Sequence, residues 1–221
     1  MTYHTQMEAA RQGIITPQME VVAEKEHLDA EVIRERVARG TVCIPANINH
    51  KNLSPEGIGE GLSTKINVNL GVGGDAHDYD EEWEKVKVAL EFGAHAIMDL
   101  SNYGKTVKFR TQLIEESTAM IGTVPMYDAI GYLEKELMDI TVDDWFEVVE
   151  YHAEQGVDFM TIHAGINRRA VAAFKEAGRM MNIVSRGGSL LFAWMEMTGN
   201  ENPFYEHYDR LLDLMYKYDV T

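Results

Sequence analysis

Six short apolar or β-branched runs recur along this chain, and their spacing constrains its fold more than any other feature. They span residues 41–46, 65–70, 94–100, 120–126, 157–163 and 183–185, so their first residues lie 24 to 37 positions apart. Each interval has room for a crossover helix and its loops, which neighbouring parallel strands require. The pattern therefore predicts repeated βα units around a parallel sheet.

Two architectures are built from such repeats, the open doubly wound sheet and the (β/α)₈ barrel. No Gly-x-Gly-x-x-Gly pattern follows the first run, which weighs against a dinucleotide-binding sheet. We therefore predict an α/β fold of the TIM-barrel type that is incomplete, with six strands and the start of a seventh at Tyr218–Thr221. Residues 1–40 are expected to form an N-terminal helical segment, and residues 41–221 a partial, substrate-binding barrel.

Local signals mark several helix ends. Thr16-Pro17 is typical of an N-cap followed by proline at the first helical position. Gly40 is expected to end a helix that starts near residue 29. Thr141 and Asp144 resemble a capping box, with aspartate in place of the usual glutamate. Further helices are predicted over residues 80–92, 170–179, 189–197 and 204–216.

Charge and cysteine content narrow the possible partners and compartment. The chain has 36 acidic and 20 basic side chains, a formal net charge of −16. Such a surface repels nucleic-acid phosphates and anionic membranes, so we expect neither partner. Cys43 is the single cysteine, so no internal disulfide forms and a reducing, cytoplasmic location is expected. No apolar run approaches the roughly 20 residues of a membrane span.

Polar residues end all six predicted strands. Because ligands bind at the carboxyl ends of strands in α/β folds, these residues are expected to converge. Asn67 and Asn69 are two positions apart and therefore point to one side of their strand, where amides suit a neutral nitrogen heterocycle. A polar interior layer is the alternative. The candidates include Asn47, Asn49, Asn67, Asn69, Tyr127, His163 and the turn Ser185-Arg186-Gly187.

His163 and Arg186 carry the strongest chemical expectations. His163 closes an apolar strand and could bind a ligand, transfer a proton or bind a metal; a core histidine tied to a carbonyl is the alternative. Ser185-Arg186-Gly187-Gly188 leads into a helix, whose N-terminal amides favour anions, so it is the expected seat of a phosphate. An ordinary glycine-rich loop is the other interpretation. His50, His77 and His95 lack metal-ligand spacing, and no metal ligands are assigned.

Several motifs, in order along the chain, resemble those of the ThiC (phosphomethylpyrimidine synthase) family. They are Pro45–His50, Glu56–Gly59, Lys65–Gly71, Met98–Ser101, Gly122–Pro125, Thr161–Gly165 and Val184–Gly188. The resemblance implies a radical S-adenosylmethionine (SAM) lyase acting on 5-aminoimidazole ribotide, with a [4Fe–4S] cluster, a divalent metal (zinc or iron) and a homodimeric assembly. The family's substrate contacts correspond to Asn69, Met98, Tyr127, His163, Ser185, Arg186 and Gly187. Met98 is a candidate through the resemblance alone.

Other segments resemble a sister group that makes 5-hydroxybenzimidazole for the lower ligand of cobamides. They are Ser101–Thr106, Ala119–Gly122, Tyr127–Tyr132 and Ser189–Glu196. The expected function is therefore the substrate-binding part of a 5-hydroxybenzimidazole synthase. The alternative within the family is formation of hydroxymethylpyrimidine phosphate for thiamine.

The family's metal-binding histidines and cysteine motif would lie beyond Thr221. A SAM-cleaving cluster needs three cysteines and the chain has one, so we expect its own cysteines to hold no cluster and the chain alone to be inactive. A fragment, a truncated product or half of a split enzyme would fit. Two other classes stay open: a non-catalytic protein that binds a phosphorylated imidazole, and a non-radical barrel enzyme using His163.

Overall fold

A computed structural model describes residues 3–75 and 78–221, so His77 lies outside the described residues. The α-helices are α1 (Gln6–Arg11), α2 (Pro17–Glu26), α3 (Ala30–Arg39), α4 (Tyr79–Glu91), α5 (Val107–Glu116), α6 (Pro125–Leu133), α7 (Val142–Gln155), α8 (Arg168–Glu176), α9 (Arg186–Thr198), α10 (Pro203–Glu206) and α11 (Tyr208–Tyr218). A short 3₁₀ helix, η1, spans Leu137–Asp139. The strands are β1 (Val42–Cys43), β2 (Ile58–Gly59), β3 (Asn67–Leu70), β4 (Ala96–Asp99), β5 (Met120–Thr123) and β6 (Phe159–Met160).

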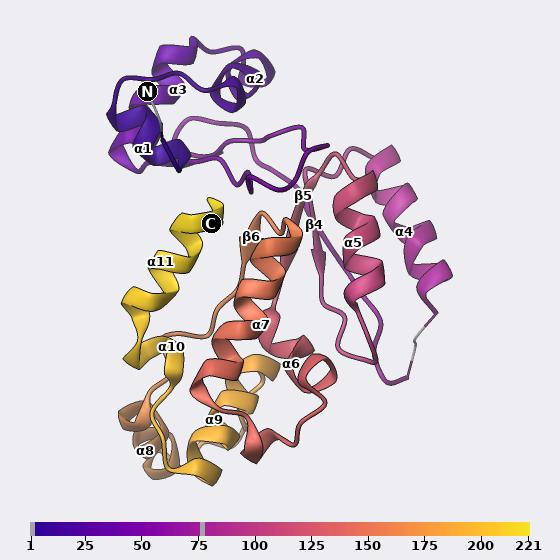
Figure 1. Ribbon diagram of the computed structural model, residues 1–221, viewed down its shortest axis with the longest axis vertical. Helices are drawn as coiled ribbons and strands as arrows, with labels where there is room; N and C mark the ends of the chain where they lie inside the picture. Colours follow the sequence, from indigo (N-terminus) through magenta and orange to yellow (C-terminus); the bar gives the residue numbers. More distant parts are fainter. Residues whose placement is uncertain (1–2, 76–77) are drawn as a thin grey trace.

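The main sheet has four parallel strands in the order β3-β4-β5-β6 (Figure 1). Helices connect successive strands: α4 joins β3 to β4, α5 joins β4 to β5, and α6 with α7 joins β5 to β6. Spatial order therefore follows chain order, as the repeated βα pattern predicts. The α/β class is confirmed.

The crossover helices α4, α5 and α7 lie on one face of this sheet. Val68 and Ile121 point to that face and share a hydrophobic cluster with Val86 of α4 and Leu113 of α5. From the same face, Thr123 contacts His152 of α7 through a 2.9 Å hydrogen bond. The wall of a parallel barrel has its helices on one side, whereas a doubly wound sheet has them on both. Closure into a complete barrel stays a prediction.

The opposite face carries the residues that alternate with the buried apolar ones. Asn69, Met98 and Gly122 are register neighbours across β3, β4 and β5 on this second face. Gly122 leaves space for Phe159 of β6, because a Cβ there would lie 2.2 Å from the phenyl ring. We call this side the inner face.

The first predicted strand is not part of the parallel sheet. β1 pairs antiparallel with β2, with Val42 opposite Gly59 and Cys43 opposite Ile58. Gly59 has a φ of +145°, and a Cβ there would lie 2.1 Å from the carbonyl oxygen of Thr41. Only glycine permits this approach. The prediction of a parallel strand at 41–46 is therefore wrong.

The predicted strand at residues 183–185 is also wrong, since this segment pairs with no strand in the described part of the chain. Ser185 instead caps α9 by accepting a 3.1 Å hydrogen bond from the N–H of Gly188. The helix consequently begins at Arg186, three residues before its predicted start.

The predicted strand start at Tyr218–Thr221 is not a strand in the described part of the chain: Tyr218 still belongs to α11, and the chain leaves the helix at Asp219. Thr221 then lies beside β6. Its carbonyl accepts from the N–H of Met160, and its N–H donates to the carbonyl of Asp158, both at 3.0 Å. The end of the segment thus takes the place beside β6 that the sixth strand was expected to fill.

The local helix signals are confirmed. Thr16 accepts a hydrogen bond from the N–H of Met19, with Pro17 at the first helical position. Gly40 ends α3 in the left-handed conformation. Both hydrogen bonds of the capping box between Thr141 and Asp144 are present at the start of α7. Among the described residues, no helix combines the length and apolar character that crossing a membrane requires.

Helices α1, α2 and α3 form a layer at one end of the molecule, at the top of Figure 1. Their apolar side chains share a cluster with Val42, Ile44 and Ala46. The layer also contacts α11: the N–H of Gln6 donates to Asp219 at 2.9 Å. Burial raises the pKa of Asp219 to about 6, since the carboxyl lies beneath α1 with that one donor.

A buried polar cluster ties the segment after β1 to the amino-terminal end of the sheet. His50 Nδ1 lies 2.8 Å from Asp158 Oδ2, and Nε2 lies 3.1 Å from the carbonyl of Ser117. Asp158 also accepts from the backbone N–H groups of Asn47 and Ile121, at 3.0 and 2.7 Å. His50 is therefore a buried structural residue.

Both partners in this cluster are best satisfied in their charged forms. Burial lowers the pKa of His50, but the hydrogen bond and charge of Asp158 and the Ser117 carbonyl outweigh burial and raise it overall. Burial also raises the pKa of Asp158. Because three N–H donors point at its oxygens, we assign the carboxylate form to Asp158 and the imidazolium form to His50.

Candidate functional site

Five of the predicted site residues lie together near the carboxyl ends of β5 and β6 and the start of α9. They are Tyr127, His163, Ser185, Arg186 and Gly187. His163 follows β6, and its Nε2 lies 2.9 Å from the hydroxyl oxygen of Ser185. The imidazole packs on the first turn of α9, where a Cβ at Gly187 would lie 2.3 Å from His163 Cε1. Glycine at 187 is thus required for the ring to occupy this position.

The His163 ring has one nitrogen with no protein partner. Its Nδ1 is buried and makes no hydrogen bond. Burial lowers the pKa of His163, which favours the neutral ring. Ser185 accepts from Gly188 and can donate its own proton to Nε2, leaving Nδ1–H as an unused donor. Buried donors usually have a partner, so this nitrogen is a candidate contact for a ligand or an ordered water.

Arg186 lies over Tyr127, with its guanidinium carbon 5.7 Å from the ring centroid. Tyr127 belongs to the first turns of α6, directly after β5. The backbone N–H groups of Arg186 and Gly187 have no hydrogen-bond partner within the described ranges. A guanidinium beside free N-terminal amides is an arrangement that favours an anion.

Asn202 holds the loop after His163, a role that we did not predict from the sequence. Its buried amide nitrogen donates to the carbonyls of His163 and Ile166, at 2.8 and 2.7 Å. Its oxygen accepts from the N–H of Phe204 as the N-cap of α10. The Asn-Pro pair at 202–203 was a visible helix-start signal, but its long-range partners were not.

Asn67, Asn69 and Met98 form a second group on the inner face. Asn67 donates its amide N–H to the oxygen of Asn69 at 2.8 Å, and both side chains are exposed. Met98 is the register partner of Asn69. Met98 also packs against the hydrophobic cluster that Tyr127 contacts. A single cavity that contains Asn69, His163 and Arg186 stays a prediction.

Asn47 and Asn49 lie at the opposite, amino-terminal end of the sheet. The Asn47 amide donates to the carbonyls of Ala153 and Val157, and its oxygen accepts from the N–H of Asn49. Asn49 donates to the carbonyl of Glu154 at the end of α7. The structure does not bring these two residues to the His163 group.

Asp128, the residue after Tyr127, forms a buried ionic cluster with Arg110 and His152. No sequence spacing indicated this cluster. Asp128 Oδ2 accepts from Arg110 Nη1 at 3.2 Å and lies 3.3 Å from His152 Nε2. Burial raises the pKa of Asp128, but the hydrogen bond from His152 and the charge of Arg110 outweigh it and lower it overall. Burial lowers the pKa of His152 to about 4. The cluster fixes the first turn of α6 and therefore the backbone of Tyr127.

Comparison with known proteins identifies the family. Residues 5–221 match the radical SAM ThiC family. The chain belongs to this family. The resemblance drawn from its motifs is thus confirmed, whereas the 5-hydroxybenzimidazole branch stays a prediction.

Three relatives show how much of a ThiC protein the chain represents. It is 61% identical to the phosphomethylpyrimidine synthase of Clostridium perfringens, 62% to that of Clostridium tetani and 60% to that of Alkaliphilus oremlandii, each over all 221 residues. The matches cover 51%, 48% and 51% of these relatives. The chain therefore spans about half the length of the curated relatives it matches.

The donor set of this chain does not fit the cluster that a radical SAM family implies. A SAM-cleaving [4Fe–4S] cluster needs three cysteine thiolates, and Cys43 is the single cysteine. Burial raises the pKa of Cys43, which disfavours its thiolate. In residues 3–75 and 78–221, no three histidine, cysteine, aspartate or glutamate side chains lie together as metal ligands.

Proposed function

We propose that this chain is the substrate-binding portion of a phosphomethylpyrimidine synthase and that it binds 5-aminoimidazole ribotide. One observation carries the proposal: His163, Ser185, Arg186 and Gly187 meet at the start of α9, beside Tyr127. Anion-binding groups and an unsatisfied imidazole donor are thereby held side by side.

In this proposal the ribotide phosphate lies at the first turn of α9. The free N–H groups of Arg186 and Gly187 donate to its oxygens, and the guanidinium of Arg186 adds a charged donor. Nδ1–H of His163 donates to another acceptor of the same ligand. Asn69 and Met98 on the inner face contact the imidazole.

The relatives bear on the choice of product. All three are named phosphomethylpyrimidine synthase, which supports the pyrimidine alternative better than the 5-hydroxybenzimidazole function expected from the sequence segments. The synthase reaction is part of the proposal, because the chain spans about half the length of the relatives that carry this name.

Titration calorimetry with 5-aminoimidazole ribotide tests the binding step. Arg186→Ala removes a charge-assisted donor worth about 1.5–3 kcal/mol, so the dissociation constant should rise about 10- to 150-fold. Arg169→Ala, which removes an exposed arginine of α8, is the matched control and should leave affinity unchanged. Equal affinities for wild type and Arg186→Ala would contradict the phosphate assignment.

A further inference from the structure

The loop that follows β6 is attached to both ends of α9. At the start of the helix, His163 Nε2 lies 2.9 Å from the hydroxyl oxygen of Ser185. In its last turn, the carbonyl of Met195 accepts a 2.9 Å hydrogen bond from Arg168 Nη1. Ten positions separate Ser185 from Met195, which is roughly 15 Å along a helix axis. Two attachments that far apart hold the direction of α9 as well as its distance from the loop.

The pair Glu201-Asn202 holds the same loop at both of its ends. The side-chain amide of Asn202 donates to the carbonyls of His163 and Ile166, at 2.8 and 2.7 Å. The carboxylate of Glu201 accepts from the backbone N–H of Arg168, at 3.0 and 3.2 Å. The loop from residue 163 to residue 168 is therefore bonded at its start and at its end to two consecutive residues.

Hydrogen bonds, more than packing, set the place of this loop. Gly165 at its tip is exposed, and a Cβ there would meet no atom within 4 Å. Ala164 and Ile166 on either side are only partly buried. Asn202, in contrast, is 0% exposed, so its two carbonyl partners cannot exchange it for water without moving. The position of His163 consequently depends on Asn202.

We propose that Asn202 is a positioning residue that keeps the His163 imidazole and the anion-binding turn, Ser185–Gly188, at one fixed separation. The inference rests on the proposed function and extends it to selectivity. A ligand uses both groups only when it carries a phosphate and a hydrogen-bond acceptor at that separation, whereas a phosphate alone needs only the turn. Because the loop is already ordered, the two-point ligand gains affinity.

The substitution Asn202→Ser separates the tether from the helix cap. Serine caps helices about as well as asparagine, so α10 keeps its cap. Serine has one donor on a shorter side chain, in place of the two N–H groups that bond the His163 and Ile166 carbonyls. Asn167→Ser is the matched control: Asn167 caps α8, and among the described residues its side chain makes no other hydrogen bond.

Two readouts report positioning. Burial lowers the pKa of His163, so release of the loop in Asn202→Ser should raise the NMR titration midpoint of His163 toward its ordinary value of about 6.5. The dissociation constant for 5-aminoimidazole ribotide should rise at least about tenfold. That for inorganic phosphate, read from the backbone amide signals of Arg186 and Gly187, should stay within about twofold, since the turn is intact. Asn167→Ser should match the wild type in all three.

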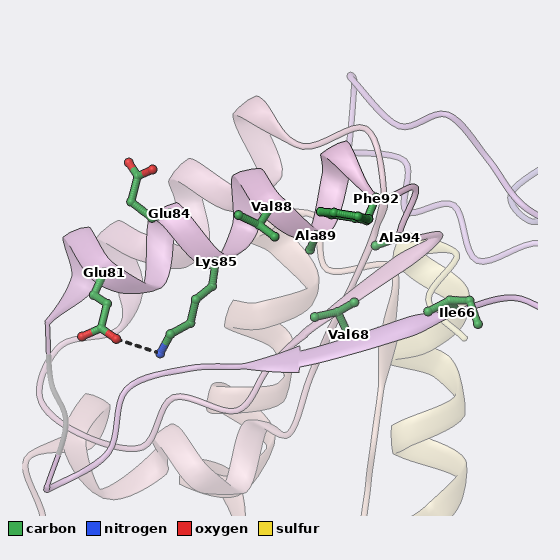
Figure 2. A pocket seen from close by; sticks show the side chains of 9 residues that line it. All are labelled: Ile66, Val68, Glu81, Glu84, Lys85, Val88, Ala89, Phe92 and Ala94. Carbon is green, nitrogen blue, oxygen red and sulfur yellow. Dashed lines mark ion pairs between the residues drawn. The ribbon is translucent and has the colours of Figure 1, made fainter.

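A remote variant controls for general destabilisation. Ala89→Gly weakens α4 in the groove against β3 that Figure 2 shows, at the other edge of the sheet from β6. It should lower the urea midpoint of unfolding and leave the His163 titration and the ribotide affinity unchanged. A measurement on the wild type needs no variant to fold: the Asn202 side-chain amide should exchange its hydrogens at least about tenfold more slowly than that of Asn167.

Each of three results would overturn the proposal. They are an unchanged His163 midpoint in folded Asn202→Ser, equal exchange of the Asn202 and Asn167 amides, and equal losses of affinity for ribotide and for phosphate. If the wild type fails to bind ribotide, the proposed function fails and the selectivity fails with it. The His163 titration and the amide exchange then still decide whether Asn202 positions the ring.

Discussion

Replacing Gly187 with alanine is the most direct perturbation of the candidate site. The new methyl group would lie 2.3 Å from His163 Cε1 and 2.6 Å from Nδ1, roughly 1 Å short of ordinary contact, which begins at 3.4 Å. The α9 backbone cannot retreat freely, since Gly188 is held by the Ser185 cap. The imidazole must therefore move and give up its hydrogen bond with Ser185.

The size of the effect follows from these contacts. Forcing one extra methyl group into a packed site costs about 1–3 kcal/mol, and loss of a hydrogen bond adds about 0.5–1.5 kcal/mol. Because the His163–Ser185 contact is partly solvent-exposed, we expect the total to be about 1–3 kcal/mol in the free energy of unfolding. The proposed site also predicts a lower affinity for 5-aminoimidazole ribotide, since the His163 ring leaves its place beside Ser185.

Urea unfolding measures the stability change, and the His163 Cε1–H signal in NMR reports the ring's surroundings. Gly165→Ala is the matched control, because a Cβ at this nearby loop glycine meets no atom within 4 Å. The control should shift stability by no more than about 0.5 kcal/mol. If Gly187→Ala matches the control in stability, in the His163 signal and in affinity, the packing of His163 on α9 is refuted.

Two further predictions concern the buried charges. The raised pKa of His50 means that the folded state holds this proton more tightly than the unfolded state. The stability that His50 contributes should therefore be fully present below about pH 6.5, its unfolded pKa, and be lost as pH rises through its folded pKa. Urea unfolding from about pH 6 to 9 measures this loss, and His50→Gln should flatten the profile. Asp128→Asn leaves Arg110 buried without its carboxylate and should cost about 3–5 kcal/mol of unfolding free energy, whereas Asp143→Asn, at an exposed ion pair, should cost at most about 0.5 kcal/mol; equal losses would contradict the role of the cluster.

Local chemistry made the helices and the parallel strands predictable. The capping box at Thr141 and Asp144 depends on residues three apart, and strand periodicity at 65–70 and 94–100 is read within one element. The pairing of β1 with β2 depends instead on the close approach of Gly59 to Thr41, which no local pattern encodes. Likewise, glycines at 187 and 188 indicated a loop, yet the Ser185 cap and the His163 contact place them in a helix.

The site was predictable to the extent that strand ends define it. His163, Ser185 and Arg186 come from segments that end or follow predicted strands, and the structure brings them together. Asn47 also follows a predicted strand, but β1 pairs with β2 and is not part of the parallel sheet. Asn47 consequently lies at the amino-terminal end of that sheet, away from His163. Asp128 and Asn202 act through partners distant in sequence, so their roles required coordinates.

The contact between Gln6 and Asp219 has a consequence for how the molecule comes apart. It holds α1 at the end of α11. The first three helices also pack on Val42, Ile44 and Ala46, in a segment that the His50–Asp158 pair ties to the amino-terminal end of the sheet. A protease that removed those helices would expose the carboxyl group of Asp219 and the apolar side chains of Val42, Ile44 and Ala46. We therefore expect a single calorimetric transition for the whole chain, with no early melting of its first 40 residues.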